Sequence, residues 1–407
     1  MRKFLLLSAV SISFLANHAQ TWPIPDTSGG RYCSEVFTSV TVTSGVVYGS
    51  SVTVGNSTQT LLMDIYQPTG DTVSRRPVIV LAHGGSFIGG SKTDAYMVTI
   101  CTRLAKLGYV TVSLEYRIGI GFPIDSINAT KAVIRATQDM KAGLRFFRQD
   151  ALGANTYKTH PNYVYAGGVS AGAFMGLHLA YLDKIAEVPT WVNIASLGGI
   201  DGNSGNPGYS HKTNAVINLC GALGDSTWLE PGDCPLLSMH GNIDATVPFG
   251  TAMIYVLSFP IMVVDGSASI KVRADNVGVP NTFYPWWGQD HTPFISNATY
   301  MDSAIWAIRD FLCPLVVQPS STGIEDMEEQ LISVYPNPAQ GHFIISTPGN
   351  FDEKIFSVYD LTGKRLLNIK SADPFLEINV ASFNAGIYLV RVELKSGAVL
   401  SRKIVIE

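Results

Sequence analysis

Ser170 stands in the pattern G-x-S-x-G, residues 168–172, and is the residue of this chain best placed to act as a nucleophile. Small and β-prone residues precede it, and apolar residues recur at helical spacing after it. The pattern therefore predicts a serine on a sharp turn from a strand into a helix, where a strained backbone exposes the hydroxyl and glycines avoid a clash. The first amides of such a helix also face a developing oxyanion. The alternative is an ordinary strand-to-helix turn.

A serine hydroxyl is a poor nucleophile unless a base takes its proton, and the chain contains eight histidines. His291 follows the last expected strand and precedes the last expected helix, so its loop can carry it over the sheet towards Ser170. We expect His291 to be the base; the alternative is a loop histidine that bonds only its neighbours. His83 and His240 stand at strand ends beside glycines, and His178 lies inside the helix after the serine, where packing is the commoner role.

The base needs an acid to orient it, and Asp244 is our candidate because it also follows a buried strand. This choice gives the chain order serine, aspartate, histidine that the α/β-hydrolase arrangement requires. Three other acids compete with it: Asp201, Asp225 and Asp290. Asp290 ranks low because adjacent residues seldom point at one another.

An oxyanion needs at least two aimed N–H donors. The amide of Ala171 is one candidate, because it follows the nucleophile. Gly84 and Gly85 are the others, because glycines after a buried strand let the backbone approach a substrate closely. The alternative for this segment is a tight turn that His83 holds by hydrogen bonds.

Three aromatic residues lie near these motifs and are candidates for the wall of a substrate pocket: Phe87, Trp286 and Trp287. The commoner fate of such side chains is core packing. No group of cysteines and histidines has metal-ligand spacing. We expect neither a metal nor an organic cofactor, because a serine triad supplies its own nucleophile and electrostatics.

The elements that must position these residues read as an α/β fold. Residues 31–67 read as opening antiparallel strands, and fully apolar runs alternating with helical patterns follow. This predicts a mostly parallel central sheet with helices on both faces, in which every candidate residue stands at the carboxyl end of a strand. The expected inner strands are 77–82, 109–114, 163–169, 191–195, 215–219 and 235–239, with helices over 94–107 and along residues 132–144.

The whole-chain figures indicate about two domains, since 407 residues with 46% hydrophobic content can bury a large core. A net charge of −4 with mixed signs gives no reason to expect a nucleic-acid or anionic-membrane partner. Arg2 and Lys3 precede an apolar run, 4–16, which predicts a signal peptide over residues 1–19, and no later stretch is long enough to span a membrane. The catalytic domain is expected over 20–314.

Residues 315–330, rich in Pro, Ser, Thr and acids, are expected to form a linker. Beyond them, residues 331–407 contain short alternating strands separated by Gly, Asn and Asp turns, which predicts a small antiparallel β-sandwich. The five cysteines leave at least one unpaired; Cys220 with Cys234 is one possible disulfide, and the partners of the others cannot be inferred from sequence.

Residues 31–314 resemble the carboxylesterase and lipase branch of the α/β-hydrolase superfamily, through segments 83–87, 115–117, 168–172, 240–248 and 288–291. The resemblance implies ester hydrolysis through an acyl-enzyme. It gives the triad roles to Ser170, Asp244 and His291 and the oxyanion hole to the amides of Gly84, Gly85 and Ala171. Many relatives have a third glycine where this chain has Ser86, so the main donor of the first loop stays open.

Residues 331–407 resemble the type IX secretion sorting domain of Gram-negative bacteria, through segments 334–338, 359–364 and 385–390. The resemblance implies recognition by the outer-membrane secretion machinery, removal of the tail, and a secreted or cell-surface location. The alternative is a carbohydrate-binding or adhesive sandwich, which a row of exposed aromatic residues would favour.

We therefore expect a secreted carboxylic ester hydrolase. The aromatic candidates suggest bulky or aromatic esters, such as feruloyl or acetylated plant polymers or synthetic polyesters. One alternative is a serine exopeptidase, because the Asp244 segment also occurs in peptidases of this fold. Another is a non-catalytic surface-binding protein.

Overall fold

The structure is a computed structural model, and it describes residues 22–317, 333–346, 353–373, 375–394 and 399–407. The expected signal peptide and most of the expected linker lie outside the described residues. The chain divides into two compact units between Val317 and Gln318. Within the described ranges, no helix is long and apolar enough to cross a membrane.

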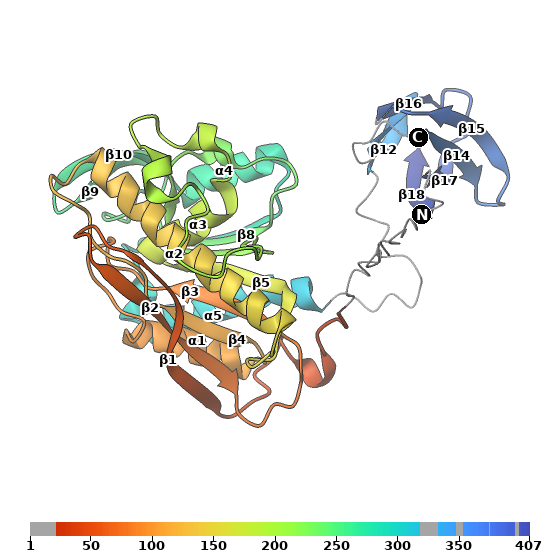
Figure 1. Cartoon of the computed structure of the whole chain (residues 1–407). Helices are drawn as coiled ribbons and strands as arrows, with labels where there is room; N and C mark the ends of the chain where they lie inside the picture. Colours follow the sequence, from red (N-terminus) through yellow and green to blue (C-terminus); the bar gives the residue numbers. More distant parts are fainter. Residues whose placement is uncertain (1–21, 318–332, 347–352, 374, 395–398) are drawn as a thin grey trace, which may run out of the picture. The chain divides into compact units, whose positions relative to one another are not determined.

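The first unit is built on an eight-stranded sheet with the order β1-β2-β4-β3-β5-β6-β8-β11 (Figure 1). The pairs β1–β2 and β2–β4 are antiparallel, and the strands from β4 to β11 along this order pair in parallel. The α/β expectation is confirmed. The strands are β1 Val40–Val52, β2 Thr58–Pro68, β3 Arg76–Ala82, β4 Val110–Leu114, β5 Thr159–Val169, β6 Val216–Leu219, β8 Leu236–Gly241 and β11 Asn281–Trp286.

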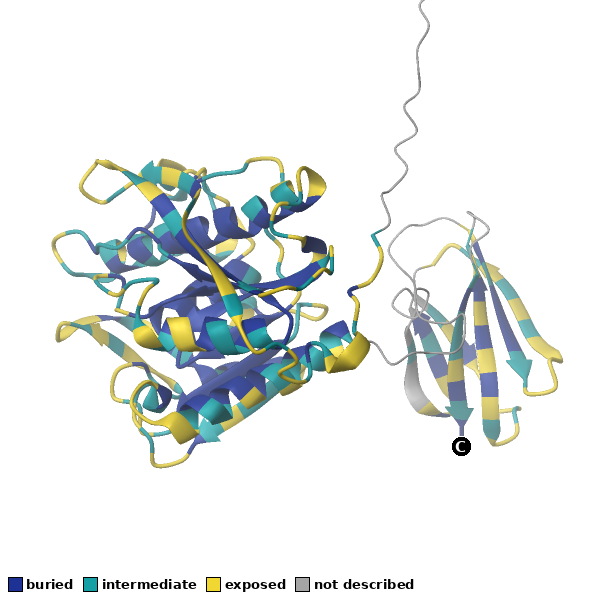
Figure 2. Ribbon diagram, turned by 90° about the horizontal axis from the view of Figure 1, so that it is seen from below, coloured by how far each residue is buried: buried dark blue, intermediate teal, exposed yellow. Residues whose placement is uncertain are grey.

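Helices cover both faces of this sheet. Side chains alternate along each strand: Val78 and Val80 of β3 pack with α2 and α3 in one core, whereas Ile79 and Leu81 pack with α1 and α5 in another. The central strands are consequently buried on both faces (Figure 2). The helices are α1 Ala95–Lys106, α2 Ser126–Leu152, α3 Ala171–Tyr181, α4 Ser267–Val277 and α5 Ala298–Val316, with short 3-10 helices η1 Ser28–Gly30, η2 Ile185–Glu187, η3 Ile194–Leu197, η4 Ser226–Trp228 and η5 Pro293–Ile295.

A second, three-stranded sheet stands beside the main one, with the order β7-β10-β9. It consists of β7 Ala222–Leu223 and the antiparallel hairpin of β9 Thr251–Val256 and β10 Phe259–Gly266. The apolar residues on one side of this hairpin join the core formed by α2 and α3.

The strand expected over 191–195 is wrong. This segment forms no strand and ends in the 3-10 helix η3, with Asn193 as its cap. Val192 is buried against Ile134 and Leu182, while Trp191 is half exposed. This segment is apolar because it packs against α2, and not because it forms a strand of the sheet.

One disulfide joins Cys33, before β1, to Cys313 in α5. Cys220 and Cys234 do not pair; they and Cys101 are free thiols. Helix α5 runs to Val316 and contains Pro314, so helix continues two residues past the expected domain end at 314.

The second unit is made of β-strands that alternate buried and exposed residues (Figure 2). Two antiparallel sets, β15-β14-β17-β18 and β12-β13-β16, meet where Ala339 of β12 pairs in parallel with Ile406 of β18. Their buried side chains form one core. The strands are β12 Ser333–Gln340, β13 His342–Ser346, β14 Lys354–Asp360, β15 Arg365–Ser371, β16 Phe375–Asn379, β17 Gly386–Glu393 and β18 Val399–Ile406.

Candidate active site

Ser170 sits between β5 and α3 with φ 54° and ψ −117°, a strained backbone for a residue other than glycine. The tight turn brings β5 and α3 against the neighbouring strand β3. A Cβ on either Gly168 or Gly172 would overlap the carbonyl oxygen of Ala82. The two glycines are therefore required by the close approach of β3, and they leave Ser170 at the carboxyl end of β5.

Three predicted site residues meet at this edge of the sheet. Ser170 Oγ lies 2.9 Å from His291 Nε2, and His291 Nδ1 lies 2.6 Å from Asp244 Oδ2. The residues come from the loops after β5, β8 and β11, and 121 positions separate the serine from the histidine. With the proton on Nδ1, the ring donates to the carboxylate and accepts from the serine hydroxyl.

The Asp244 carboxylate is held in its charged form. Burial favours the neutral acid, but hydrogen bonds from His240 and His291 and from the Val247 amide outweigh it and hold the pKa of Asp244 well below its usual value. Its Oδ1 accepts from the amides of Thr246 and Val247, both at 2.8 Å. The carboxylate is thus fixed in orientation and available to an imidazolium.

The three competing acids have other partners. Asp290 Oδ1 accepts from the amides of Ala245 and His291, so this carboxylate ties the two loops together and does not face the imidazole. Asp225 caps η4, and Asp201 lies beside Lys141.

His240 is a member of this network that sequence reasoning passed over. Its side chain is fully buried, and Nε2 lies 3.1 Å from both Asp244 Oδ2 and the Val247 carbonyl oxygen. Its Nδ1 lies 2.8 Å from Ser267 Oγ, which accepts from Asn218 Nδ2. The signal in the sequence that could have identified His240 is the presence of polar residues in strands that are otherwise apolar. His240 and His291 therefore contact the same carboxylate oxygen, and His240 helps to position it.

The expected oxyanion donors differ in whether their N–H groups are already hydrogen-bonded. The Gly84 amide donates to Tyr96 Oη at 2.9 Å and is already used. The amides of Gly85, Ser86 and Ala171 have no acceptor within the described part of the chain. Gly85 has φ +121°, a backbone conformation that glycine adopts readily and other residues rarely adopt. A Cβ atom at this position would overlap the backbone of the next turn.

The loop that carries these amides is anchored from below. Tyr116 donates its hydroxyl to the His83 carbonyl oxygen at 3.1 Å and stacks on the His83 ring. His83 Nδ1 lies 2.7 Å from the Gly84 carbonyl oxygen. Arg117, the residue after Tyr116, forms a buried ion pair with Asp139 at 2.8 Å. His83 therefore helps to hold the turn that carries the Gly85 and Ser86 amides.

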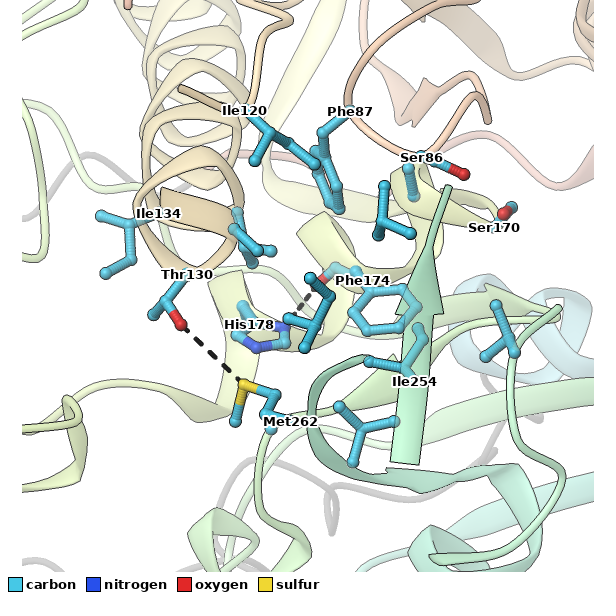
Figure 3. Close-up of a pocket in the computed structure, with 18 of the residues that line it drawn as sticks. Ser86, Phe87, Ile120, Thr130, Ile134, Ser170, Phe174, His178, Ile254 and Met262 are labelled. Atoms are coloured by element: carbon cyan, nitrogen blue, oxygen red, sulfur yellow. Dashed lines mark hydrogen bonds between the residues drawn. The ribbon is translucent and has the colours of Figure 1, made fainter. Parts of the chain in front are cut away.

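An apolar pocket opens at Ser170 and runs between α2, α3 and the β9–β10 hairpin (Figure 3). Phe87 lines it and contacts the ring of Phe174 edge-on. The other two aromatic candidates do not line it: Trp286 is buried against Phe294, and Trp287 is 71% exposed. Trp286 ends the edge strand β11 and Trp287 follows it, which explains why neither lines the pocket. Apolar side chains that line the pocket include Ile120, Val133, Phe174, Leu182, Ile254, Val256, Ile261 and Val264.

Among the described residues, one set of three potential metal ligands converges: Cys220, Asp244 and His291, with ligand atoms within 4.8 Å of one another. Burial raises the pKa of the Cys220 thiol to about 12, so it stays protonated. The Asp244 and His291 atoms already bond each other. This set is better suited to hydrogen bonding than to a metal.

A mostly parallel sheet flanked by helices, with a serine on a strand-to-helix turn and an acid and a histidine on later strand ends, defines the α/β-hydrolase fold. Residues 63–223, which include Ser170, match the BD-FAE family model. Residues 333–407 match the secretion system C-terminal sorting domain. The chain therefore joins an esterase-like α/β-hydrolase unit to a type IX sorting domain, which indicates secretion to the cell surface or beyond.

Solved structures similar to this chain include esterase 2 of Thermogutta terrifontis. Its propionate-bound form shares 20% sequence identity, covers 68% of this chain and 95% of its own, and has a TM-score of 0.49. The form phosphorylated by paraoxon shares 20% identity, covers 69% of this chain and 95% of its own, and has a TM-score of 0.49. No curated protein matches the sequence.

Proposed function

We propose that this chain is a secreted serine carboxylic ester hydrolase that works through an acyl-enzyme. The observation that carries the proposal is the continuous hydrogen-bond chain from Ser170 through His291 to Asp244. The unpaired amides of Gly85 and Ala171 beside it support the same reading. A nucleophile, a base, an oriented acid and oxyanion donors are the parts that acyl transfer needs.

In the proposed reaction, Ser170 Oγ attacks the ester carbonyl carbon while its proton passes to His291 Nε2. The oxyanion accepts hydrogen bonds from the Gly85 and Ala171 amides. The C–O bond to the alcohol breaks as His291 returns the proton to the leaving oxygen. Water, deprotonated by His291, then attacks the acyl carbon; the bond to Ser170 Oγ breaks as His291 returns the proton to that oxygen, and the acid is released. Asp244 stabilises the imidazolium at both stages.

The pocket supports an ester with an apolar acyl group. Its lining is almost entirely apolar, and Phe87 and Phe174 add aromatic walls. Bulky or aromatic acyl groups, such as the feruloyl type, fit this chemistry. Among the described residues that line the pocket there is no carboxylate that would hold a free amino terminus, so this lining does not favour the exopeptidase alternative.

Hydrolysis of p-nitrophenyl esters of increasing acyl length by the full chain tests this function. We expect Ser170→Ala and His291→Ala each to lower kcat by about 10⁴-fold or more. His211→Ala is the matched control, because this loop histidine lies beside Asp201 and not in the pocket, and it should keep activity within a few-fold. A folded wild type that cleaves none of the esters, or an active Ser170→Ala variant, would contradict the proposal.

A further inference from the structure

The buried side chains behind Asp244 form a hydrogen-bond chain whose direction can be worked out from one end. Asn218 of β6 accepts the Gly221 amide on Oδ1 at 2.8 Å, so the other side of its carboxamide is the NH2 group. This Nδ2 lies 3.0 Å from Ser267 Oγ and 2.9 Å from Ser238 Oγ. Because an amide nitrogen only donates, Ser267 Oγ accepts this bond and keeps its own proton for another partner.

His240 is the partner that takes the Ser267 proton. Its Nδ1 lies 2.8 Å from Ser267 Oγ and accepts this bond, so the single proton of the ring is on Nε2. The other side of the ring requires the same arrangement. There, Nε2 lies 3.1 Å from Asp244 Oδ2 and from the Val247 carbonyl oxygen, and both of these atoms are acceptors. The two ends of the chain therefore agree on one tautomer, in which the N–H group of His240 is directed at the carboxylate.

The members of this hydrogen-bond chain are shielded from water. The side chains of Asn218, His240 and Ser267 have no exposed surface. The ring of Phe249 meets the ring of His240 edge-on, with the ring centroids 5.7 Å apart. In such surroundings a hydrogen bond is stronger than in water, and a donor or acceptor without a partner is costly. The loss of one member should therefore be felt by the next, because water has no ready access to replace it.

We propose that Asn218 and Ser267 are positioning residues, which act on the triad through His240. They keep the His240 ring in the Nε2–H tautomer, and this N–H group fixes the Asp244 oxygen that His291 also contacts. Asp244 Oδ2 lies 2.6 Å from His291 Nδ1, so a displacement of this oxygen changes the orientation of the base. This inference rests on the proposed function and extends it to residues that lie behind the triad.

Two substitutions of His240 separate the effect of its N–H group from the effect of its volume. Glutamine places its amide nitrogen where Nε2 stands and can still donate to Asp244, whereas leucine has a similar volume and no donor. We expect His240→Gln to keep kcat of the full chain for p-nitrophenyl butyrate within about fivefold. His240→Leu should lower kcat about 100-fold, because a buried carboxylate oxygen loses a donor. Equal losses in the two variants would show a packing role alone and would overturn the proposal.

Two buried serines that share the Asn218 amide form a matched pair. Ser267→Ala removes the bond to His240, whereas Ser238→Ala removes a hydroxyl that bonds the same amide from the neighbouring strand. We expect Ser267→Ala to lower kcat about tenfold and Ser238→Ala to stay within about twofold. Urea unfolding checks that both variants are folded. Similar losses in the two serine variants, or no loss in Ser267→Ala, would contradict the proposed role of Ser267.

Nitrogen NMR of the full chain with isotope-labelled histidine measures the tautomer in the absence of substrate. The signals of His240 are those that disappear in His240→Gln. We expect the ring proton on Nε2 in the wild type and in Ser238→Ala. In Ser267→Ala the Nδ1 signal should move downfield, because an unprotonated ring nitrogen loses its hydrogen-bond donor.

A wild-type His240 ring that carries its proton on Nδ1 would refute the inference. Identical His240 signals in the wild type and in Ser267→Ala would also refute it. Neither result depends on hydrolysis, so this inference can fail while the esterase proposal stands. The esterase proposal fails separately, if the folded wild type cleaves no ester.

Discussion

At the scale of single residues, the choice between two neighbouring acids is the sharpest test of the triad proposal. Asp244→Asn should lower kcat by about 10⁴-fold, because an amide nitrogen facing His291 Nδ1 imposes the wrong tautomer on the ring. Asp290→Asn should stay within about tenfold, since an amide oxygen can still accept from the Ala245 and His291 amides. Steady-state ester kinetics at pH 7.5 measure both. A larger loss in Asp290→Asn would reverse the assignment.

Sequence could predict the residues that meet at the strand ends, because parallel strands place their carboxyl ends on one edge of a sheet. This logic located Ser170, Asp244 and His291. It could not predict that Tyr96, from a different helix, takes the Gly84 amide, because that contact depends on how α1 packs. The same limit applies to Trp286, whose neighbours are set by tertiary packing.

At the scale of elements, the β9–β10 hairpin, which covers the pocket, contains a turn whose backbone conformation is unfavourable for its residues. Leu257 and Ser258 form its two-residue loop, with φ 47° and 69°, where asparagine and glycine are the favoured residues. Replacing the pair by Asn-Gly should raise the free energy of unfolding by about 1 kcal/mol. Urea unfolding measures this gain, and Leu152→Asn controls for the loss of an exposed leucine. An unchanged or lower stability would refute the turn assignment.

Element type was predictable where apolar runs are long and buried on both faces, as in β3 and β4. It failed over 191–195 because a short apolar run that packs on a helix looks the same as a short inner strand. Sequence reasoning also gave no account of the hairpin, whose strands are exposed on one side and carry apolar residues there.

At the scale of the whole molecule, buried neutral histidines should set the acid limit of stability. Burial lowers the pKa of His160 and of His178 from 6.5 to about 4. The unfolded chain therefore binds more protons than the folded chain between pH 6.5 and 4, so the free energy of unfolding falls as pH falls through this window. His178 alone should contribute on the order of 3 kcal/mol to the loss.

Urea unfolding between pH 7.5 and 4.5 measures this dependence. Phenylalanine at position 178 cannot take up a proton. In His178→Phe the free energy of unfolding should therefore fall less steeply with pH, by up to the slope that one proton contributes. If the slopes of the wild type and of this variant coincide, His178 is not the neutral buried group described above.

The Cys33–Cys313 disulfide closes most of the first unit into a covalent ring, because the two cysteines are 280 positions apart. The chain leaves this ring at two branch points that lie next to each other, one towards the N-terminus and one towards the sorting domain. A single protease cut inside the ring leaves one covalent piece that still holds Ser170, Asp244 and His291 together. A cut in either branch removes that branch and leaves the ring whole. A cut between the ring and the sorting domain therefore separates the two units, whereas one cut inside the ring separates no part of the first unit covalently.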